Sequence, residues 1–287
     1  MNIVLGATGQ IGSMVVKEIS WLGKPVRAVV RTPARFQEKN IEMLQADMFD
    51  TKQLIAAFQE GTTVFLLTPE DPSSNSILED TARIVENFVT AAETTGIQKI
   101  VALSCVGAHL NDKTGNILMS RMLEQGIAGI KAEKIIIRPA YYYSNWMGFL
   151  DPVKQYGVLP SFFPATFKFD MHSPIDLATF IGKLMTDANG ENSKSLYELS
   201  GPQKYSATDV AKSFSRILNK EIDIQEILPE QWMETLLSAG FTENTAMHLS
   251  DMTKALIEGM ISPEYPDKVI HLPSTIETYL QSQLVRS

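Results

Sequence analysis

Cysteine is nearly absent from this sequence, which has one, Cys105, among 287 residues. A single cysteine excludes an internal disulfide and is typical of a reducing compartment. Long apolar runs are also lacking, because no stretch reaches the length of a membrane span. The chain begins in a strand-like segment, without the basic region and cleavage site of a signal peptide. We therefore expect a cytoplasmic protein.

Basic residues are outnumbered, with 25 Lys and Arg against 33 Asp and Glu and a net charge of −8. Nucleic-acid binding needs clustered positive charge, so we expect no direct nucleic-acid partner. The lack of a long apolar run likewise leads us to expect no membrane partner. His, Cys and carboxylate residues show no metal-ligand spacing, so no metal site is expected. The hydrophobic fraction of 44% suits a globular protein with a core of ordinary size.

Glycine recurs every third residue in the opening segment, which reads MNIVLGATGQIG and has glycines at positions 6, 9 and 12. An apolar run ends at Gly6, and an amphipathic helical pattern follows, an order that indicates dinucleotide binding. Gly6 permits the turn, Gly9 lets the backbone approach a pyrophosphate, and Gly12 lets the helix pack on the strand. The helix N-terminus favours the anion. The residues expected to bind the pyrophosphate are Gly6, Thr8, Gly9, Gln10, Ile11 and Gly12.

Strand-like and helix-like patterns alternate over the first 140 residues. We expect strands at 3–5, 25–30, 41–45, 63–67, 99–103 and 134–137, and helices at 11–21, 52–58, 77–94 and 116–125. Such alternation predicts an α/β fold, a doubly wound parallel sheet of Rossmann type. After Pro139 the sequence becomes rich in aromatics and proline. We therefore expect an NAD(P)-binding domain over 1–145 and a smaller α/β substrate lobe over 146–287, interleaved with the first.

An ordered set of motifs resembles one known family. The motifs are Gly-Ala-Thr-Gly-Gln-Ile-Gly from Gly6, Val-Arg-Ala-Val-Val-Arg ending at Arg31, Ala46-Asp47, Ser104-Cys105-Val106-Gly107-Ala108, Ile137-Arg138-Pro139 and Ser200-Gly201-Pro202. Together they resemble the NmrA-like branch of the atypical short-chain dehydrogenases. They look most like its small bacterial NAD(P)H-dependent quinone and azo reductases. The resemblance covers most of the chain and implies a Rossmann fold with a substrate cleft beside a smaller lobe.

The end of the second strand bears on cofactor choice. NAD-selective sites place an Asp or Glu there to accept from the ribose 2′-hydroxyl. Residues 28–35 contain no carboxylate. Arg31 falls where a guanidinium would pair with a 2′-phosphate, with Arg35 assisting, so we expect NADP(H). The alternative is that Arg31 is a solvated surface residue.

Further cofactor contacts are expected at three other strand ends. The resemblance implies that Asp47 accepts from the adenine amino group, with Met48 nearby; the alternative is a turn or N-cap aspartate. Thr68 ends the fourth strand, where it would contact the ribose of the nicotinamide half. Backbone at Pro139 would border the nicotinamide, and Arg138 is either part of that border or structural.

The Tyr and Lys pair of ordinary short-chain dehydrogenases is missing. Such enzymes use a Lys four residues after the Tyr to lower the phenol pKa. Residues 104–121 contain no Tyr, and the helix that normally carries the Lys has Met119, Ser120 and Arg121. A proton-relay alcohol dehydrogenase is therefore disfavoured, and no catalytic residue is assigned. His109 and Tyr142 are the candidates for contacting a substrate.

Two functions remain open. In the first, the chain is an NADPH-dependent reductase that passes hydride to a quinone-like or other electron-poor small molecule. Tyr142, Tyr143, Trp146 and Phe149 would then sandwich a flat aromatic substrate, or else pack the lobe. In the second, the chain is a non-catalytic NADP(H)-binding redox sensor that acts through a regulatory protein partner. A homodimer contact on the last helices is also left open.

Overall fold

The computed structural model describes residues 1–32, 40–111, 113–187 and 194–284. Within these residues, a central sheet is formed by β1 (Asn2–Val4), β2 (Val26–Val30), β3 (Ile41–Gln45), β4 (Thr63–Leu67), β5 (Lys99–Leu103), β6 (Glu133–Pro139), β10 (Leu196–Ser200) and β13 (Ile270–His271). The spatial order is β13-β10-β6-β5-β4-β1-β2-β3, and all of these neighbours pair in parallel. The doubly wound parallel sheet expected from the sequence is confirmed.

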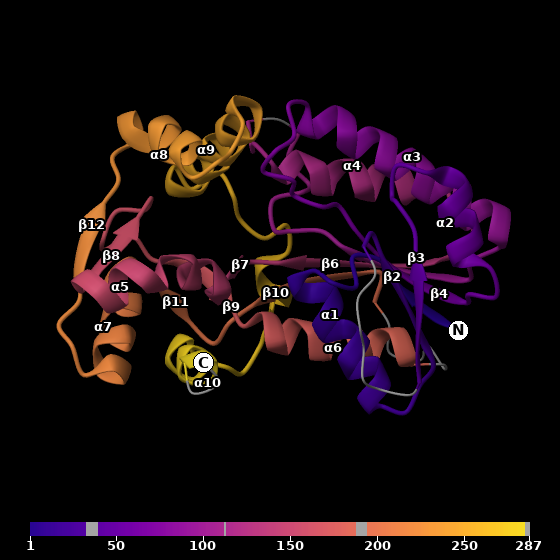
Figure 1. The fold of residues 1–287 in the computed structure, drawn as a ribbon, viewed down its shortest axis with the longest axis horizontal. Helices are drawn as coiled ribbons and strands as arrows, with labels where there is room; N and C mark the ends of the chain where they lie inside the picture. Colours follow the sequence, from indigo (N-terminus) through magenta and orange to yellow (C-terminus); the bar gives the residue numbers. More distant parts are fainter. Residues whose placement is uncertain (33–39, 112, 188–193, 285–287) are drawn as a thin grey trace.

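Helices cover both faces of this sheet. One face carries α2 (Thr51–Phe58), α3 (Ile77–Thr95) and α4 (Ile117–Ile127), and the other carries α1 (Gln10–Trp21) and α6 (Pro174–Thr186) (Figure 1). Alternate strand residues enter the two cores: Ile3 and Leu5 pack toward α2 and α3, whereas Val4 packs toward α1 and α6. The central strands β1, β4 and β5 are buried on both faces and are mostly apolar in sequence.

The remaining elements form a smaller lobe, seen at the other end of the molecule from the N-terminus (Figure 1). Its strands are β7 (Tyr141–Tyr142), β8 (Val158–Ser161), β9 (Phe169–His172), β11 (Lys204–Tyr205) and β12 (Asp223–Glu226). Its helices are η1 (Tyr143–Phe149), α5 (Leu150–Tyr156), α7 (Ala207–Leu218), η2 (Pro229–Gln231), α8 (Trp232–Ser238), α9 (Glu243–Ile257), η3 (Pro266–Lys268) and α10 (Ile276–Leu284). The chain thus leaves the central sheet after β6, returns for α6 and β10, and returns again for β13.

Helix α9 binds the lobe to the loops that follow β4 and β5. The side chain of Thr245 donates to the carbonyl of Pro72 at 2.9 Å, and Asn244 Oδ1 accepts the N–H of Ile77 at 2.9 Å. The N–H of Asn116 donates to the carbonyl of His248 at 3.3 Å. These bonds hold the loops that carry the candidate site at the carboxyl edge of the sheet. No described helix combines the length and apolar character needed to cross a membrane.

Candidate functional site at the carboxyl edge of the sheet

The turn after β1 brings two segments of backbone unusually close together. Gly6 has a φ of +61°, in the left-handed region that favours glycine. The N–H of Gly9 donates to the carbonyl of Gly6 at 2.8 Å. A Cβ on Gly12 would lie 2.2 Å from that same carbonyl oxygen. Only a residue without a side chain fits at position 12 while α1 begins this close to β1.

The first turn of α1 presents backbone donors at this point. Gly9 is the N-cap and supplies no side-chain acceptor. The N–H groups of Gln10, Ile11 and Gly12 belong to the first turn, where a helix has no acceptors of its own. Thr8, Gly9 and Gln10 are exposed. The sheet order changes direction between β1 and β4, which is where open α/β sheets bind ligands. The geometry therefore suits a diphosphate.

Arg31 directly follows β2 and is exposed, with its carbonyl accepting from Gln45 Nε2 at 3.1 Å. Hydrogen bonds from Ser73 lower the pKa of Asp71, and the positive charge of Arg31 adds to that effect. Arg31 is thus near the loop after β4, on the same edge as the glycine turn. Arg35 lies outside the described residues.

Asp47 has a local structural role after β3. Its Oδ1 accepts the N–H of Phe49 at 2.9 Å, and its own N–H donates to Gln53 Oε1 at 2.9 Å. The N-cap of α2 is Asp50, which accepts from the N–H groups of Lys52 and Gln53. Asp47 is therefore a turn residue in this structure, and its contact with an adenine stays a prediction.

The other expected contacts lie at the same edge. Leu67 ends β4 and packs over the glycine turn, since its Cδ2 lies 3.3 Å from where a Gly6 Cβ would be. Thr68 follows and is half-buried, as is Met48 after β3. The carbonyl of Pro139 accepts the N–H of Val106 at 3.0 Å, which joins the ends of β5 and β6.

Tyr142 lacks the electrostatics of a dehydrogenase tyrosine. Burial raises the pKa of its phenol, and electrostatic interactions with the Cys105 and Glu70 side chains act in the same direction. Its ring meets that of His172 edge-on, with centroids 5.1 Å apart. Among the described residues, no lysine is a cause of the pKa shift of this phenol. Tyr142 is thus a poorer acid than a free tyrosine.

The two histidines nearest the loops differ in character. His109 is half-buried, and its Nδ1 is buried without a hydrogen-bond partner among the described residues. His172 is fully buried, with Nδ1 3.0 Å from the carbonyl of Ser173, and burial lowers its pKa to about 4. His172 is therefore a neutral packing residue, whereas His109 remains a candidate for contacting a substrate.

Two of the aromatics considered for a substrate sandwich belong to the lobe core. Tyr143 is 0% exposed and Trp146 is 2% exposed, and they pack with Phe163, Phe169 and their neighbours. Trp146 Nε1 lies 3.3 Å from the sulfur of Met171. The packing alternative is therefore correct for these two residues. The other two aromatics considered for the substrate sandwich, Tyr142 and Phe149, are half-buried and retain exposed surface.

Arg138 is a structural residue. It is 5% exposed and forms a two-pronged ion pair with Glu124 of α4, at 2.8 and 2.7 Å. Glu264 accepts from the same guanidinium at 2.5 Å, and Glu198 of β10 lies 3.8 Å away. These acids come from three separate segments, so Arg138 ties β6 to α4, to β10 and to the chain before η3.

Residues missed by the sequence reasoning gather at the start of α4. Asn116 and Ser120 are four residues apart and share a helix face. Asn116 Nδ2 donates to Glu70 Oε1 at 3.1 Å. Burial raises the pKa of the Cys105 thiol to about 12 despite a hydrogen bond from Ser120, so this thiol is not a nucleophile. The only signal for Glu70 was its position three residues after an apolar strand.

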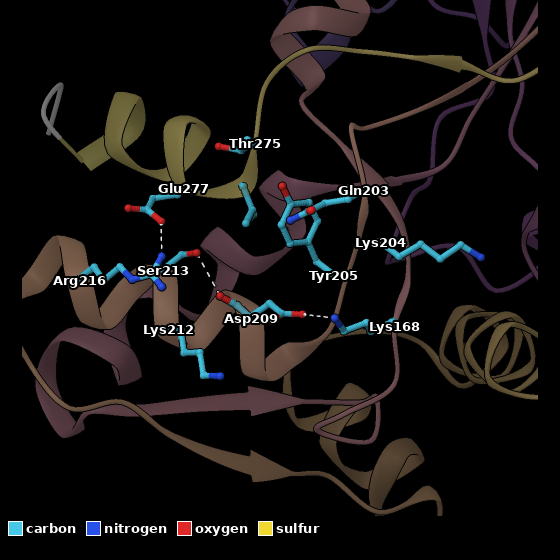
Figure 2. A pocket seen from close by; sticks show the side chains of 11 residues that line it. Lys168, Gln203, Lys204, Tyr205, Asp209, Lys212, Ser213, Arg216, Thr275 and Glu277 are labelled. Carbon is cyan, nitrogen blue, oxygen red and sulfur yellow. Dashed lines mark hydrogen bonds and ion pairs between the residues drawn. The ribbon is translucent and has the colours of Figure 1, made fainter.

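A separate hollow of about 310 Å³ lies in the smaller lobe, between α7 and the start of α10 (Figure 2). Three of its cations are in ion pairs: Lys168 with Asp209 at 3.7 Å, Lys204 with Asp170 at 3.5 Å, and Arg216 with Glu277 at 2.7 Å. None of its lining residues belongs to the glycine turn or to the loops after β2, β3, β4 and β5. It is therefore not the dinucleotide site expected from the glycine turn.

The parallel sheet, its topology and the glycine turn define a Rossmann-type α/β protein. The chain belongs to the NmrA-like family, whose sequence model matches residues 2–280. It is 24% identical over 261 residues to the NAD(P)H azoreductase of Xenophilus azovorans, covering 88% of this chain and 86% of that protein. It is 25% identical over 260 residues to quinone oxidoreductase 2 of Escherichia coli strain K12, with the same shares covered.

Solved structures agree on the fold. An NADPH-dependent quinone oxidoreductase from Escherichia coli, solved in complex with NADPH, has a TM-score of 0.78 at 22% identity. The match covers 99% of this chain and 100% of that one. The family expected from the sequence motifs is therefore confirmed, and so is the Rossmann-type fold.

Proposed function

We propose that this chain binds NADP(H) and reduces a quinone-like or other electron-poor small molecule. The observation that carries the proposal is the glycine turn, in which a Cβ at position 12 would lie 2.2 Å from the Gly6 carbonyl oxygen. So close an approach places the first turn of α1, whose N–H groups have no acceptors within the helix, beside the end of β1, which suits a diphosphate. The azo and quinone reductase relatives support the choice of reaction.

In this proposal the chain holds the dinucleotide by its strand ends. Thr8, Gly9, Gln10, Ile11 and Gly12 bind the diphosphate. Arg31 pairs with the 2′-phosphate of the adenosine half, and Asp47 and Met48 border the adenine. Thr68 and the backbone of Pro139 flank the nicotinamide half. The residues present thus offer donors to the phosphates and, at the end of β2, a cation in place of the carboxylate that selects NAD.

The bound cofactor supplies a hydride, and the protein supplies position. The acceptor would lie over the nicotinamide half, at the side of the site that Tyr142 and Phe149 border with their exposed surface. The environment of Tyr142 argues against a phenolate relay, so the proposed reaction does not use a Tyr and Lys pair. The small-molecule acceptor would enter from the side of the smaller lobe.

The test combines binding with turnover. Calorimetric titration of purified protein with NADPH and with NADH measures the affinity for each, and absorbance of the reduced nicotinamide then follows turnover with a panel of quinones. We expect NADPH to bind more tightly than NADH, and at least one quinone to be reduced. Tight NADPH binding without turnover across the panel would favour the redox sensor. If neither dinucleotide binds, the proposal is wrong.

A further inference from the structure

Glu70 is in an unusual position at the tip of the loop after β4. Its side chain keeps exposed surface, yet loss of solvation raises the pKa of its carboxyl above the ordinary value, and the hydrogen bond from Asn116 only partly opposes that rise. The loop that carries Glu70 follows β4, at the carboxyl edge of the sheet where the dinucleotide site is proposed. A raised pKa and solvent access are the properties of a general acid that can be reprotonated from solvent after each turnover.

The neighbours of Glu70 place it at the proposed acceptor site. Its charge raises the pKa of Cys105 after β5 and of Tyr141 and Tyr142 in β7. Glu70 follows Thr68, the residue expected beside the nicotinamide ribose, by two positions. The carboxyl therefore lies among the ends of β4, β5 and β7, at the nicotinamide end of the dinucleotide site.

The position of Glu70 is fixed from the side of α4. Asn116 Nδ2 donates to Glu70 Oε1 at 3.1 Å, and the backbone N–H of Asn116 is held by the carbonyl of His248 in α9. Asn116 Oδ1 is buried without a hydrogen-bond partner among the described residues. The amide donates to one carboxyl oxygen of Glu70, and in the proposal below the second oxygen carries the proton.

We propose that Glu70, positioned by Asn116, is the proton donor that completes reduction of the acceptor. This inference rests on the proposed reductase function. A bound NADPH would supply the hydride from a C–H bond of its dihydronicotinamide and be oxidised to NADP⁺. The hydride forms an O–H bond at one oxygen of the quinone and leaves a hydroquinone monoanion. The Glu70 O–H bond then breaks, and its proton goes to the remaining oxygen. The product is the neutral hydroquinone, and the Glu70 carboxylate regains a proton from solvent.

The first test compares two acceptors in the Glu70→Gln variant. A quinone needs a proton after hydride transfer, whereas a cationic triarylmethane dye accepts a hydride at its central carbon and becomes neutral without one. Loss of a general acid typically costs roughly 10²- to 10⁴-fold in rate. We expect quinone reduction to fall about a hundredfold and dye reduction to fall far less. Equal losses with both acceptors would contradict a proton-donor role.

The matched control is Glu79→Gln, which removes an exposed carboxylate from the first turn of α3 without touching the acceptor site. NADPH affinity is measured for both variants. Unchanged affinity together with an unchanged quinone rate in Glu70→Gln would overturn the proton donor and leave the proposed function intact. Failure of the wild-type protein to bind NADPH would instead overturn the proposed function.

The second test needs neither cofactor nor turnover. Carbon-detected NMR of protein labelled at glutamate carboxyl carbons gives the pKa of Glu70, whose signal is identified by its loss in Glu70→Gln. We expect a value above the ordinary range in the wild type. Asn116→Ala should raise it further, because the amide hydrogen bond lowers it. The high-pH limit of quinone reduction should move upward with it. An ordinary pKa, unaffected by Asn116→Ala, would refute the inference.

Discussion

Replacing Gly12 with alanine tests the glycine turn directly. The added methyl would lie 2.2 Å from the carbonyl oxygen of Gly6, 2.7 Å from its carbonyl carbon and 3.2 Å from Cα of Ala7. All three neighbours are backbone atoms, so no side-chain rotation relieves the clash. Ordinary non-bonded separations are roughly 3.5–4.0 Å between carbons. The start of α1 must therefore move away from the end of β1 by roughly 1 Å.

Two opposing terms set the effect on stability. Overpacking of this kind typically costs about 1–3 kcal/mol. Alanine is a better helix former than glycine by roughly 0.8–1 kcal/mol, and position 12 lies within α1. We therefore expect a net loss of about 0–2 kcal/mol in the free energy of unfolding, which a protein of this size survives.

The effect on NADPH affinity should be larger. The shift displaces the N–H groups of the first turn from the diphosphate, and each hydrogen bond to a charged group is worth about 1.5–3 kcal/mol. Loss of one such bond weakens binding by roughly 10- to 150-fold. Titration calorimetry gives the affinity, and circular dichroism confirms that the variant is folded. The control is Gly129→Ala, because a Cβ at Gly129 would meet no heavy atom within 4 Å. A folded Gly12→Ala protein with wild-type NADPH affinity would refute the reasoning.

Three further predictions concern selectivity and stability. Arg31→Ala should weaken NADPH binding roughly 10- to 150-fold and NADH binding very little; equal losses in parallel titrations would remove the case for a 2′-phosphate contact. Glu124→Gln removes one of the three carboxylates around Arg138, which keeps Glu264 and Glu198, and should lower the free energy of unfolding by about 1.5–3 kcal/mol. Chemical denaturation measures this, with the exposed pair residue Glu258→Gln costing less than about 1 kcal/mol. Burial lowers the pKa of His172 to about 4 in the folded protein. As the pH falls below about 6.5, the imidazole therefore becomes protonated in the unfolded chain while it stays neutral in the folded one, and the folded state loses stability. The wild type should then lose about 3 kcal/mol relative to His172→Phe between pH 7 and pH 4, and an equal pH dependence of the two proteins would contradict the prediction.

The parts of the fold that follow from local pattern were predictable. The strands expected at 25–30 and 63–67 and the helix expected at 11–21 agree with β2, β4 and α1 to within one residue at each end. In a parallel sheet covered on both faces, a strand is typically a short apolar run. The tight turn into the first helix requires glycines at a fixed spacing in the sequence. Such signals need no knowledge of distant contacts.

The parts that depend on tertiary contacts were not predictable. Arg138 meets Glu264 across 126 positions of sequence, and Glu70 meets Asn116 across 46. The aromatic stretch after Pro139 posed a different difficulty. Adjacent tyrosines in a short strand and a 3-10 helix turn to different sides, so Tyr142 keeps exposed surface while Tyr143 is fully buried. Composition alone gives no means of separating them.

The same contacts explain how a helix without the Tyr and Lys pair can still serve a reductase. A Tyr and Lys relay needs a cation that lowers a phenol pKa, whereas here the phenol of Tyr142 and the thiol of Cys105 are both held neutral by burial. Glu70 is an exposed residue, and its carboxyl accepts a hydrogen bond from Asn116, the N-cap residue of α4. An acceptor that needs one proton after hydride transfer can take it from such an acid without a phenolate. If Glu70→Gln reduces quinones as fast as the wild type at every pH, that proton comes from solvent, and the start of α4 serves only to close the fold.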